Sequence, residues 1–76
     1  MNINDFKNHI NSLASHVLFD FNGKECGVDP LSKNKFDVWY GENLQTVQSV
    51  NDVMTIPIFD GQSLTQVFDK INKIDY

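Results

Sequence analysis

The chain has 76 residues, enough for one small hydrophobic core and too few for a second, so residues 1–76 are expected to form a single domain. Ten acidic residues against six lysines, with no arginine, give a formal net charge of −4 at pH 7. Because nucleic-acid binders rely on arginine-rich basic surfaces, this balance argues against direct binding of nucleic acid.

Cysteine usage and the N-terminal sequence both favour a cytoplasmic protein. The single cysteine, Cys26, excludes an internal disulfide and fits a reducing compartment. Residues Met1 to Phe6 lack the basic start and apolar run of a signal peptide, and no apolar stretch approaches the length that crosses a bilayer. We therefore expect no membrane association. The abundance of Asn, Ile, Lys, Asp and Phe suggests an AT-rich coding genome.

The first predicted element is a helix. Asn2 or Asn4 can cap its start, and Asp5 favours the positive first turn. Apolar residues then recur at intervals of three and four, which places them on one helical face. These residues are Ile3, Phe6, Ile10, Leu13 and Val17. We expect the helix to end near Ala14 or Ser15.

Alternation with a period of two predicts strands from residue 17 onward. Residues 17–21 form the first strand, and Asn22-Gly23 is the strongest two-residue hairpin signal. The return strand is expected over residues 24–28, ended by Asp29-Pro30 and followed by a polar loop over 31–34. A third strand spans residues 36–40, and a short fourth is expected around Leu44 to Val47.

Two further helices are predicted in the last third of the chain. Ser49 caps a short helix in which Val50, Val53 and Met54 face inward before Pro57. Ser63 and Gln66 form a capping box, after which five apolar residues follow helical spacing as far as residue 74. They are Leu64, Val67, Phe68, Ile71 and Ile74.

These elements predict a two-layer α+β domain. An antiparallel meander of three to four strands would carry the N-terminal and C-terminal helices on one face, since both helices and the sheet have a single apolar side.

Two segments carry a resemblance to a known group. Residues 36–41, Phe-Asp-Val-Trp-Tyr-Gly, and residues 58–64, Ile-Phe-Asp-Gly-Gln-Ser-Leu, resemble short uncharacterised proteins of low-GC Gram-positive bacteria and their phages. The resemblance covers roughly residues 17–74. It implies a bacterial or phage origin, and it implies no catalytic residues.

The sequence offers no convincing catalytic or metal-binding cluster, so we expect neither an enzyme nor a cofactor. Cys26 is followed by no base, and the neighbouring Glu25 would raise the pKa of its thiol. His9 and His16 lie two helical turns apart, too far to share a metal. Asp20 and Asp37 would lie close together if their strands were neighbours, although solvation of a polar sheet face explains them better.

Trp39 is the candidate interface residue. If Phe36, Val38 and Tyr40 face the core, Trp39 points to the opposite face of the sheet. The candidate partner-binding set on that face is Trp39, Asp37, Asp20 and Leu18. Tryptophan is enriched at binding hot spots. Two alternatives stay open: the segment from Pro30 to Lys35 covers Trp39, or the strand register is reversed.

Three functions follow from these patterns. The first is a small interaction or regulatory module that docks a protein partner through the polar sheet face. The second is an acidic inhibitor that imitates nucleic acid with spaced carboxylates. Those carboxylates are Asp20, Asp29, Asp37, Asp52 and Asp60. The third is a very small enzyme or ligand-binding protein, although a domain of this size has little room for a pocket of about 300 Å³ or more. A homodimer is left open, because self-association could create such a pocket between subunits.

Overall fold

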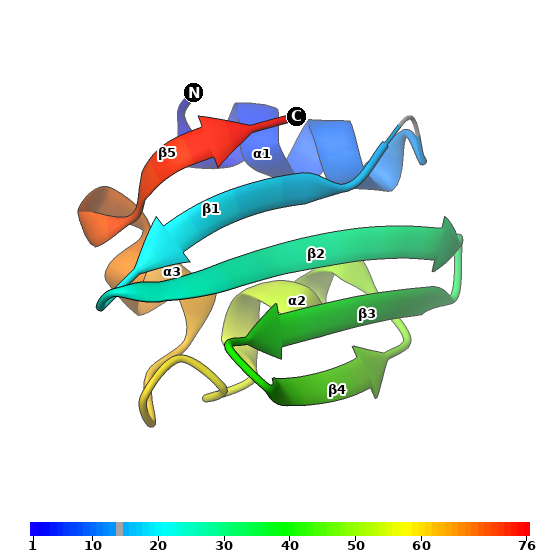
Figure 1. The fold of residues 1–76 in the computed structure, drawn as a ribbon. Coiled ribbons are helices and arrows are strands. Elements are labelled where there is room, and N and C mark those ends of the chain that lie inside the picture. The colour runs from blue at the N-terminus through cyan, green and yellow to red at the C-terminus, as the bar shows by residue number, and fades with distance from the viewer. Residues whose placement is uncertain (14) are drawn as a thin grey trace.

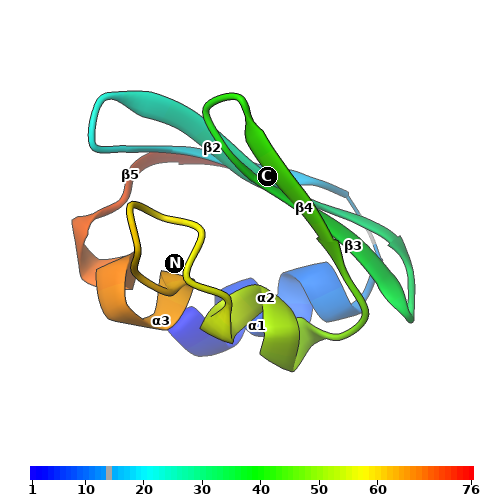
Figure 2. The ribbon, with the colours of Figure 1, turned by 90° about the horizontal axis from the view of Figure 1, so that it is seen from below.

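The computed structural model describes residues 1–13 and 15–76, which form one antiparallel sheet with helices packed on one of its faces (Figures 1 and 2). The elements are α1 (Ile3–Asn11), β1 (Val17–Phe21), β2 (Lys24–Ser32), β3 (Lys35–Tyr40), β4 (Asn43–Val47), α2 (Val50–Thr55), α3 (Leu64–Val67), the 3-10 helix η1 (Phe68–Lys70) and β5 (Asn72–Asp75). The strand order is β4-β3-β2-β1-β5. The predicted two-layer α+β class is confirmed, with a four-stranded meander and one added edge strand.

The core lies between the sheet and the helices. Every second residue of β1 and β3 points into it, and none of the side chains concerned is more than 8% exposed. They are Val17, Phe19, Phe21, Phe36, Val38 and Tyr40. The helices add Phe6, Ile10, Val53, Met54, Leu64 and Val67 from the other side. The recurrence of apolar residues, every second residue in the strands and about every 3.6 residues in the helices, therefore identified the buried faces correctly.

The β1–β2 turn confirms the Asn-Gly hairpin. Asn22 and Gly23 have φ values of 55° and 76°, the left-handed conformation that a two-residue turn with type I′ geometry requires at both positions. The turn fixes the register of the hairpin, in which Phe21 pairs with Lys24 and Val17 with Val28. This register decides which side chains share the outer face.

The first helix is shorter than the sequence predicted. It ends at Asn11, where the Ser12 hydroxyl donates a hydrogen bond of 2.7 Å to the His9 carbonyl and Leu13 adopts a positive φ of 59°. Serine competes for backbone partners in this way, which disfavours further helix. Ala14, one of the two predicted end points, lies outside the described residues.

Strand β2 is longer than predicted, because Asp29-Pro30 does not end it. The strand continues to Ser32, and Pro30 pairs with Phe36 of β3. On its other side, β2 has β1 as a neighbour only as far as Val28, which pairs with Val17. Pro30 lies beyond that point, so its missing N–H faces no strand there. The predicted loop over residues 31–34 is consequently a tight turn at Lys33-Asn34.

The predicted final helix is correct only in its first half. The capping box of Ser63 and Gln66 is present, but α3 ends at Val67, and residues 72–75 form β5 beside β1. Ile71 and Ile74 still pack against the core, three residues apart. A strand allows this because the β1–β5 register shifts at a bulge, where Lys73 adopts a φ of 55°. An apolar spacing of three therefore fits both a helix and a bulged strand.

Lys73→Gly distinguishes the two conformations. We expect it to leave the free energy of unfolding unchanged or to raise it by up to about 1 kcal/mol, because glycine adopts a positive φ without a Cβ penalty. In a helix the same change would cost about 1 kcal/mol. The ion pair that Lys73 makes is largely exposed and contributes little. Urea unfolding measures the difference.

Lys70→Gly is the matched control for this substitution. Lys70 is exposed and lies in η1 with no positive φ, so glycine there should lower the free energy of unfolding by about 0.5–1 kcal/mol. An equal loss of unfolding free energy in Lys73→Gly and Lys70→Gly would contradict the left-handed conformation of Lys73 in the bulge.

Candidate functional site

One face of the sheet is not covered by any helix or loop of the described residues. The helices and the loop between α2 and α3 all lie on the other side (Figure 2). We call the uncovered side the outer face. All four predicted partner-binding residues lie on it: Leu18 and Asp20 come from β1, and Asp37 and Trp39 come from β3. Within the described residues no helix is long and apolar enough to cross a membrane.

Both alternatives for Trp39 are wrong. Residues 30–35 form the end of β2, a turn and the start of β3, so they do not cover Trp39. The register is as predicted, since Phe36 and Val38 are completely buried on the inner side.

An apolar row crosses the middle of the outer face. The register places Leu44 of β4 opposite Trp39, Trp39 opposite Gly27, and Gly27 opposite Leu18. We call Leu18, Gly27, Trp39 and Leu44 the apolar row. Leu18 is 37% exposed and Leu44 is 55% exposed, while Trp39 is half-buried. The row thus presents large apolar side chains to solvent across four strands.

Gly27 explains why the tryptophan is only half exposed. The indole lies directly over this glycine, which is buried although it carries no side chain. A Cβ at position 27 would lie 2.7 Å from both Cε2 and Cη2 of Trp39, and closer still to Cζ2. An aromatic ring that covers a strand glycine in this way also restores packing that the glycine lacks. One side of the ring therefore packs on the strand, and the rest remains available for contact.

Two pairs of acidic residues flank the apolar row. Asp20 pairs with Glu25 on one side of Gly27, and Asp29 pairs with Asp37 on the other. Each pair lies two positions along the strands from the row, a distance of about 7 Å. Like charges directly opposite one another destabilise a sheet. A partner whose positive charges neutralised these pairs would therefore gain more binding free energy than a partner that met the same charges scattered over the surface.

Asp20 and Asp37 would lie close together only if their strands were neighbours, and the strands are not neighbours. Strand β2 separates β1 from β3, so the two carboxylates lie two strands apart and on opposite sides of the row. They cannot act as a general acid and base pair.

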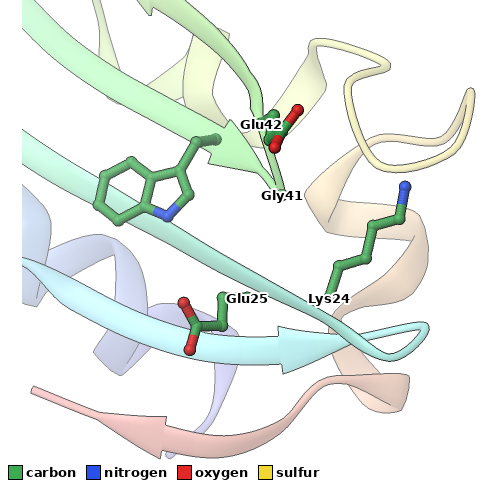
Figure 3. A pocket seen from close by; sticks show the side chains of 5 residues that line it. Lys24, Glu25, Gly41 and Glu42 are labelled. Atoms are coloured by element: carbon green, nitrogen blue, oxygen red, sulfur yellow. The ribbon is translucent and has the colours of Figure 1, made fainter.

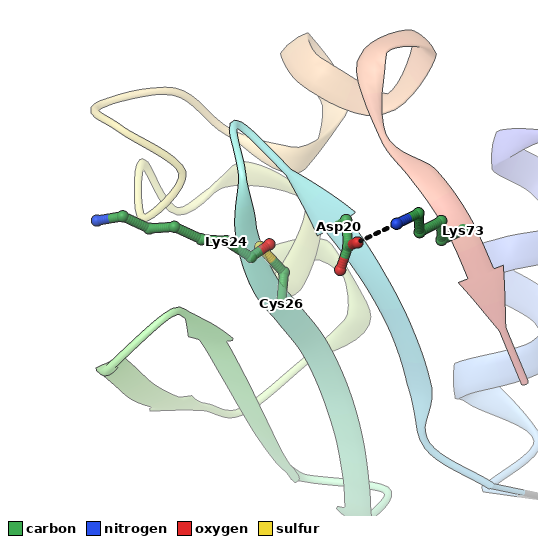
Figure 4. A network of polar contacts seen from close by, with 4 residues as sticks. All are labelled: Asp20, Lys24, Cys26 and Lys73. Atoms are coloured by element: carbon green, nitrogen blue, oxygen red, sulfur yellow. Dashed lines mark hydrogen bonds and ion pairs between the residues drawn. The ribbon is translucent and has the colours of Figure 1, made fainter.

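Each of these two aspartates has one polar contact instead. Lys73 of β5 reaches Asp20 with its Nζ 3.6 Å from Oδ2, as Figure 4 shows. The Thr46 hydroxyl donates a hydrogen bond of 2.6 Å to Oδ1 of Asp37. Both contacts are near the surface, and both hold a carboxylate in place at the edge of the apolar row.

Two hollows adjoin Trp39 on this face. The first has a volume of about 520 Å³ and is lined by Lys24, Glu25, Trp39, Gly41 and Glu42 (Figure 3). The second, of about 320 Å³, extends from Trp39 and Glu25 towards Leu18, Asp20, Lys73 and Asp75. Both are open depressions of the surface.

Cys26 does not show the surroundings of a nucleophile. Its side chain is 2% exposed and belongs to the core. Burial is the main cause that raises the pKa of the thiol, and the charge of Asp20 adds to it, so the thiolate form that a nucleophile needs is disfavoured. The predicted direction was right, but burial rather than Glu25 is responsible. His9 hydrogen-bonds Ser15 through Nε2 at 3.0 Å, and its ring meets that of Tyr76 edge-on.

The described residues contain no cluster of three or more His, Cys, Asp or Glu side chains that could hold a metal ion. The five aspartates of the proposed nucleic-acid mimic do not form one array. Asp20, Asp29 and Asp37 lie on the outer face, whereas Asp52 lies in α2 and Asp60 in the turn before α3, both on the helical side (Figure 2).

Gly27, Leu44, Glu25 and Asp29 were missed as members of this face. A signal for them exists in the sequence: each two-residue hairpin turn fixes which residues pair, so Asn22-Gly23 places Gly27 opposite Leu18, and Gly41-Glu42 places Leu44 opposite Trp39. No comparable signal placed Lys73 on this face, because the apolar residues around it follow helical spacing and predicted a helix there.

Comparisons with known proteins give no family for this chain. No protein-family model matches it, and neither a curated protein nor a solved structure matches it significantly. Function must therefore be argued from the site.

Proposed function

We propose that this domain is a small non-enzymatic interaction or regulatory module that docks a protein partner on the outer face of its sheet. One observation carries the proposal: an apolar row with exposed Leu18 and Leu44 crosses a face that no other part of the described chain covers. Flat apolar surfaces centred on tryptophan are the usual anchors of protein interfaces. The partner would meet the row with apolar side chains.

The charges narrow the kind of partner. Four carboxylates in two cross-strand pairs flank the row, and Lys73 forms an ion pair with one of them, Asp20. A partner surface with lysine or arginine on both sides of an apolar ridge would be complementary to this pattern. Such complementarity mainly raises the association rate and selects among partners, while Trp39 would hold the complex together.

The experiment compares capture of partners from a bacterial lysate by the tagged chain and its variants. We expect Trp39→Ala and Leu18→Ala each to weaken capture at least about tenfold, as hot-spot truncations do. Leu31→Ala is the matched control, since Leu31 is 49% exposed but lies outside the apolar row. Circular dichroism checks that all variants fold. Equal capture by the folded Trp39→Ala variant and the parent chain would contradict docking on this face.

The nucleic-acid mimic is the second candidate, and the same assay separates it. Binding through carboxylates alone would weaken steeply with salt and would respond to Asp29→Asn more than to Trp39→Ala. The distribution of the five aspartates over both sides of the molecule favours the docking module instead.

A further inference from the structure

The two edges of the sheet differ in how they are protected. Strand β5, at one edge, carries charges at Lys73 and Asp75 and is interrupted by the bulge. Such features keep an edge strand from pairing with another chain. Strand β4, at the other edge, has the sequence Asn-Leu-Gln-Thr-Val, without a charge, a proline or a bulge. Its first four residues are exposed. Figure 1 shows β4 as the outermost strand with nothing beside it.

The backbone of β4 offers unpaired hydrogen-bonding groups along this edge. Tyr40 and Asn43 close the two-residue turn between β3 and β4, and such a closing pair is hydrogen-bonded. Because bonded and non-bonded pairs alternate, Asn43, Gln45 and Val47 bond to β3. The N–H and C=O groups of Leu44 and Thr46 therefore point outward, where they can pair with another strand.

We propose that β4 pairs with β4 of a second copy of this chain, antiparallel about a two-fold axis at Gln45. This register uses the outward groups of Leu44 and Thr46 in both copies and joins the two sheets into one. On the outer face each Leu44 then lies beside Thr46 of the second copy, which covers a leucine that is 55% exposed in the single chain. The two apolar rows meet at this seam.

The edge is complementary to a second copy of itself. In this register Asn43 lies opposite Val47, Leu44 opposite Thr46 and Gln45 opposite its own counterpart, so no like charges meet along the seam. Outside the edge the two chains still repel, since each carries a net charge of −4. The pairing should therefore tighten as salt screens this repulsion, which is the opposite of the salt dependence expected for a basic partner. It does not rest on the proposed docking function, because Leu18 and Trp39 stay uncovered.

Sedimentation equilibrium of the full chain from about 10 μM to 1 mM tests the proposal, since five paired residues form less than a standard interface and imply a weak dimer. We expect a monomer–dimer equilibrium whose dissociation constant falls severalfold between about 20 and 500 mM NaCl. Leu44→Lys should weaken dimerisation at least about tenfold, because the new lysines approach one another diagonally across the seam. That variant lowers the net negative charge, so a weaker dimer cannot result from greater overall repulsion.

Leu31→Lys makes the same change of charge at an equally exposed leucine away from the edge and should leave the dissociation constant within about twofold. Amide hydrogen exchange of the unmodified chain gives a second readout that needs no variant. The amides of Leu44 and Thr46 should become more protected as concentration rises, while those of β5 should not. A monomer at 1 mM in high salt, a dimer that Leu44→Lys and Leu31→Lys weaken equally, or protection confined to β5 would each overturn the proposal.

Discussion

Replacing Gly27 by alanine should destabilise the folded chain by about 1–3 kcal/mol, as overpacking of a filled site does. Alanine would ordinarily improve a strand, because glycine loses more backbone entropy on folding. Here the new Cβ would collide with the indole of Trp39, which lies directly over the glycine. The ring must lift away from β2 and give up its packing on the strand. Urea unfolding measures the loss, and a shift in tryptophan emission would report the displaced ring.

A double-mutant cycle isolates the contact responsible. In a Trp39→Ala background the space above residue 27 is empty, so Gly27→Ala should stabilise the chain by about 0.5–1 kcal/mol through the entropy of the unfolded state. The sign of the effect therefore reverses, with a coupling energy of about 1.5–4 kcal/mol between the two sites. If Gly27→Ala had the same effect in both backgrounds, contact with the Trp39 ring would not be the reason why alanine is unfavourable at position 27.

Phe59→Ala should cost about 3–5 kcal/mol, the range for removing a buried phenylalanine. Phe59 is completely buried, and its ring centroid lies 5.8 Å from that of Phe19 and 6.1 Å from that of Tyr40. It joins the loop before α3 to the sheet. A chain of 76 residues is expected to have a total stability of about 4–11 kcal/mol, so a loss of this size would remove at least about a quarter of it and, at the lower end, all of it. Thermal unfolding should show a midpoint lowered by more than about 12 °C.

Two variants calibrate the Phe59 result. Phe59→Leu keeps most of the apolar volume and should cost less than about 1.5 kcal/mol. Leu44→Ala removes an apolar side chain that is 55% exposed and should change the free energy of unfolding by less than about 0.5 kcal/mol. A loss below 1 kcal/mol for Phe59→Ala would show that this loop is not anchored in the core.

The sheet was predictable because its signals are local. Alternation in residues 17–21 and 36–40 gave the inner face, and Asn22-Gly23 gave the first hairpin. Pro30 misled the prediction because a proline is excluded from a strand only where a neighbouring strand needs its N–H, and that neighbour is known only from the fold.

The end of the chain was less predictable because its spacing fits two structures. Leu64, Val67 and Phe68 follow a helical period, and Ile71 and Ile74 continue it by coincidence. The helix does not continue because residues 72–75 form β5 instead, which pairs with the edge of β1 that β2 leaves open. A single chain gives no local signal for pairing between residues more than fifty positions apart, since that pairing depends on how the rest of the molecule folds.

The candidate site was predicted in its composition and not in its arrangement. Leu18, Asp20, Asp37 and Trp39 do share one face. Their mutual positions depend on β2 lying between β1 and β3, which separates the two aspartates and places Gly27 beneath the indole. The condition for a contact between Asp20 and Asp37, that their strands be neighbours, is not met for this reason.

Trp39 is the only tryptophan in the chain, and it lies at the centre of the outer face. The intrinsic fluorescence of the protein under selective excitation therefore comes from a single fluorophore on the surface where docking is proposed. Any molecule that binds there would change the polarity around this indole, so titrations could be followed optically on the unlabelled chain, without a dye or a tag that could itself occupy the face.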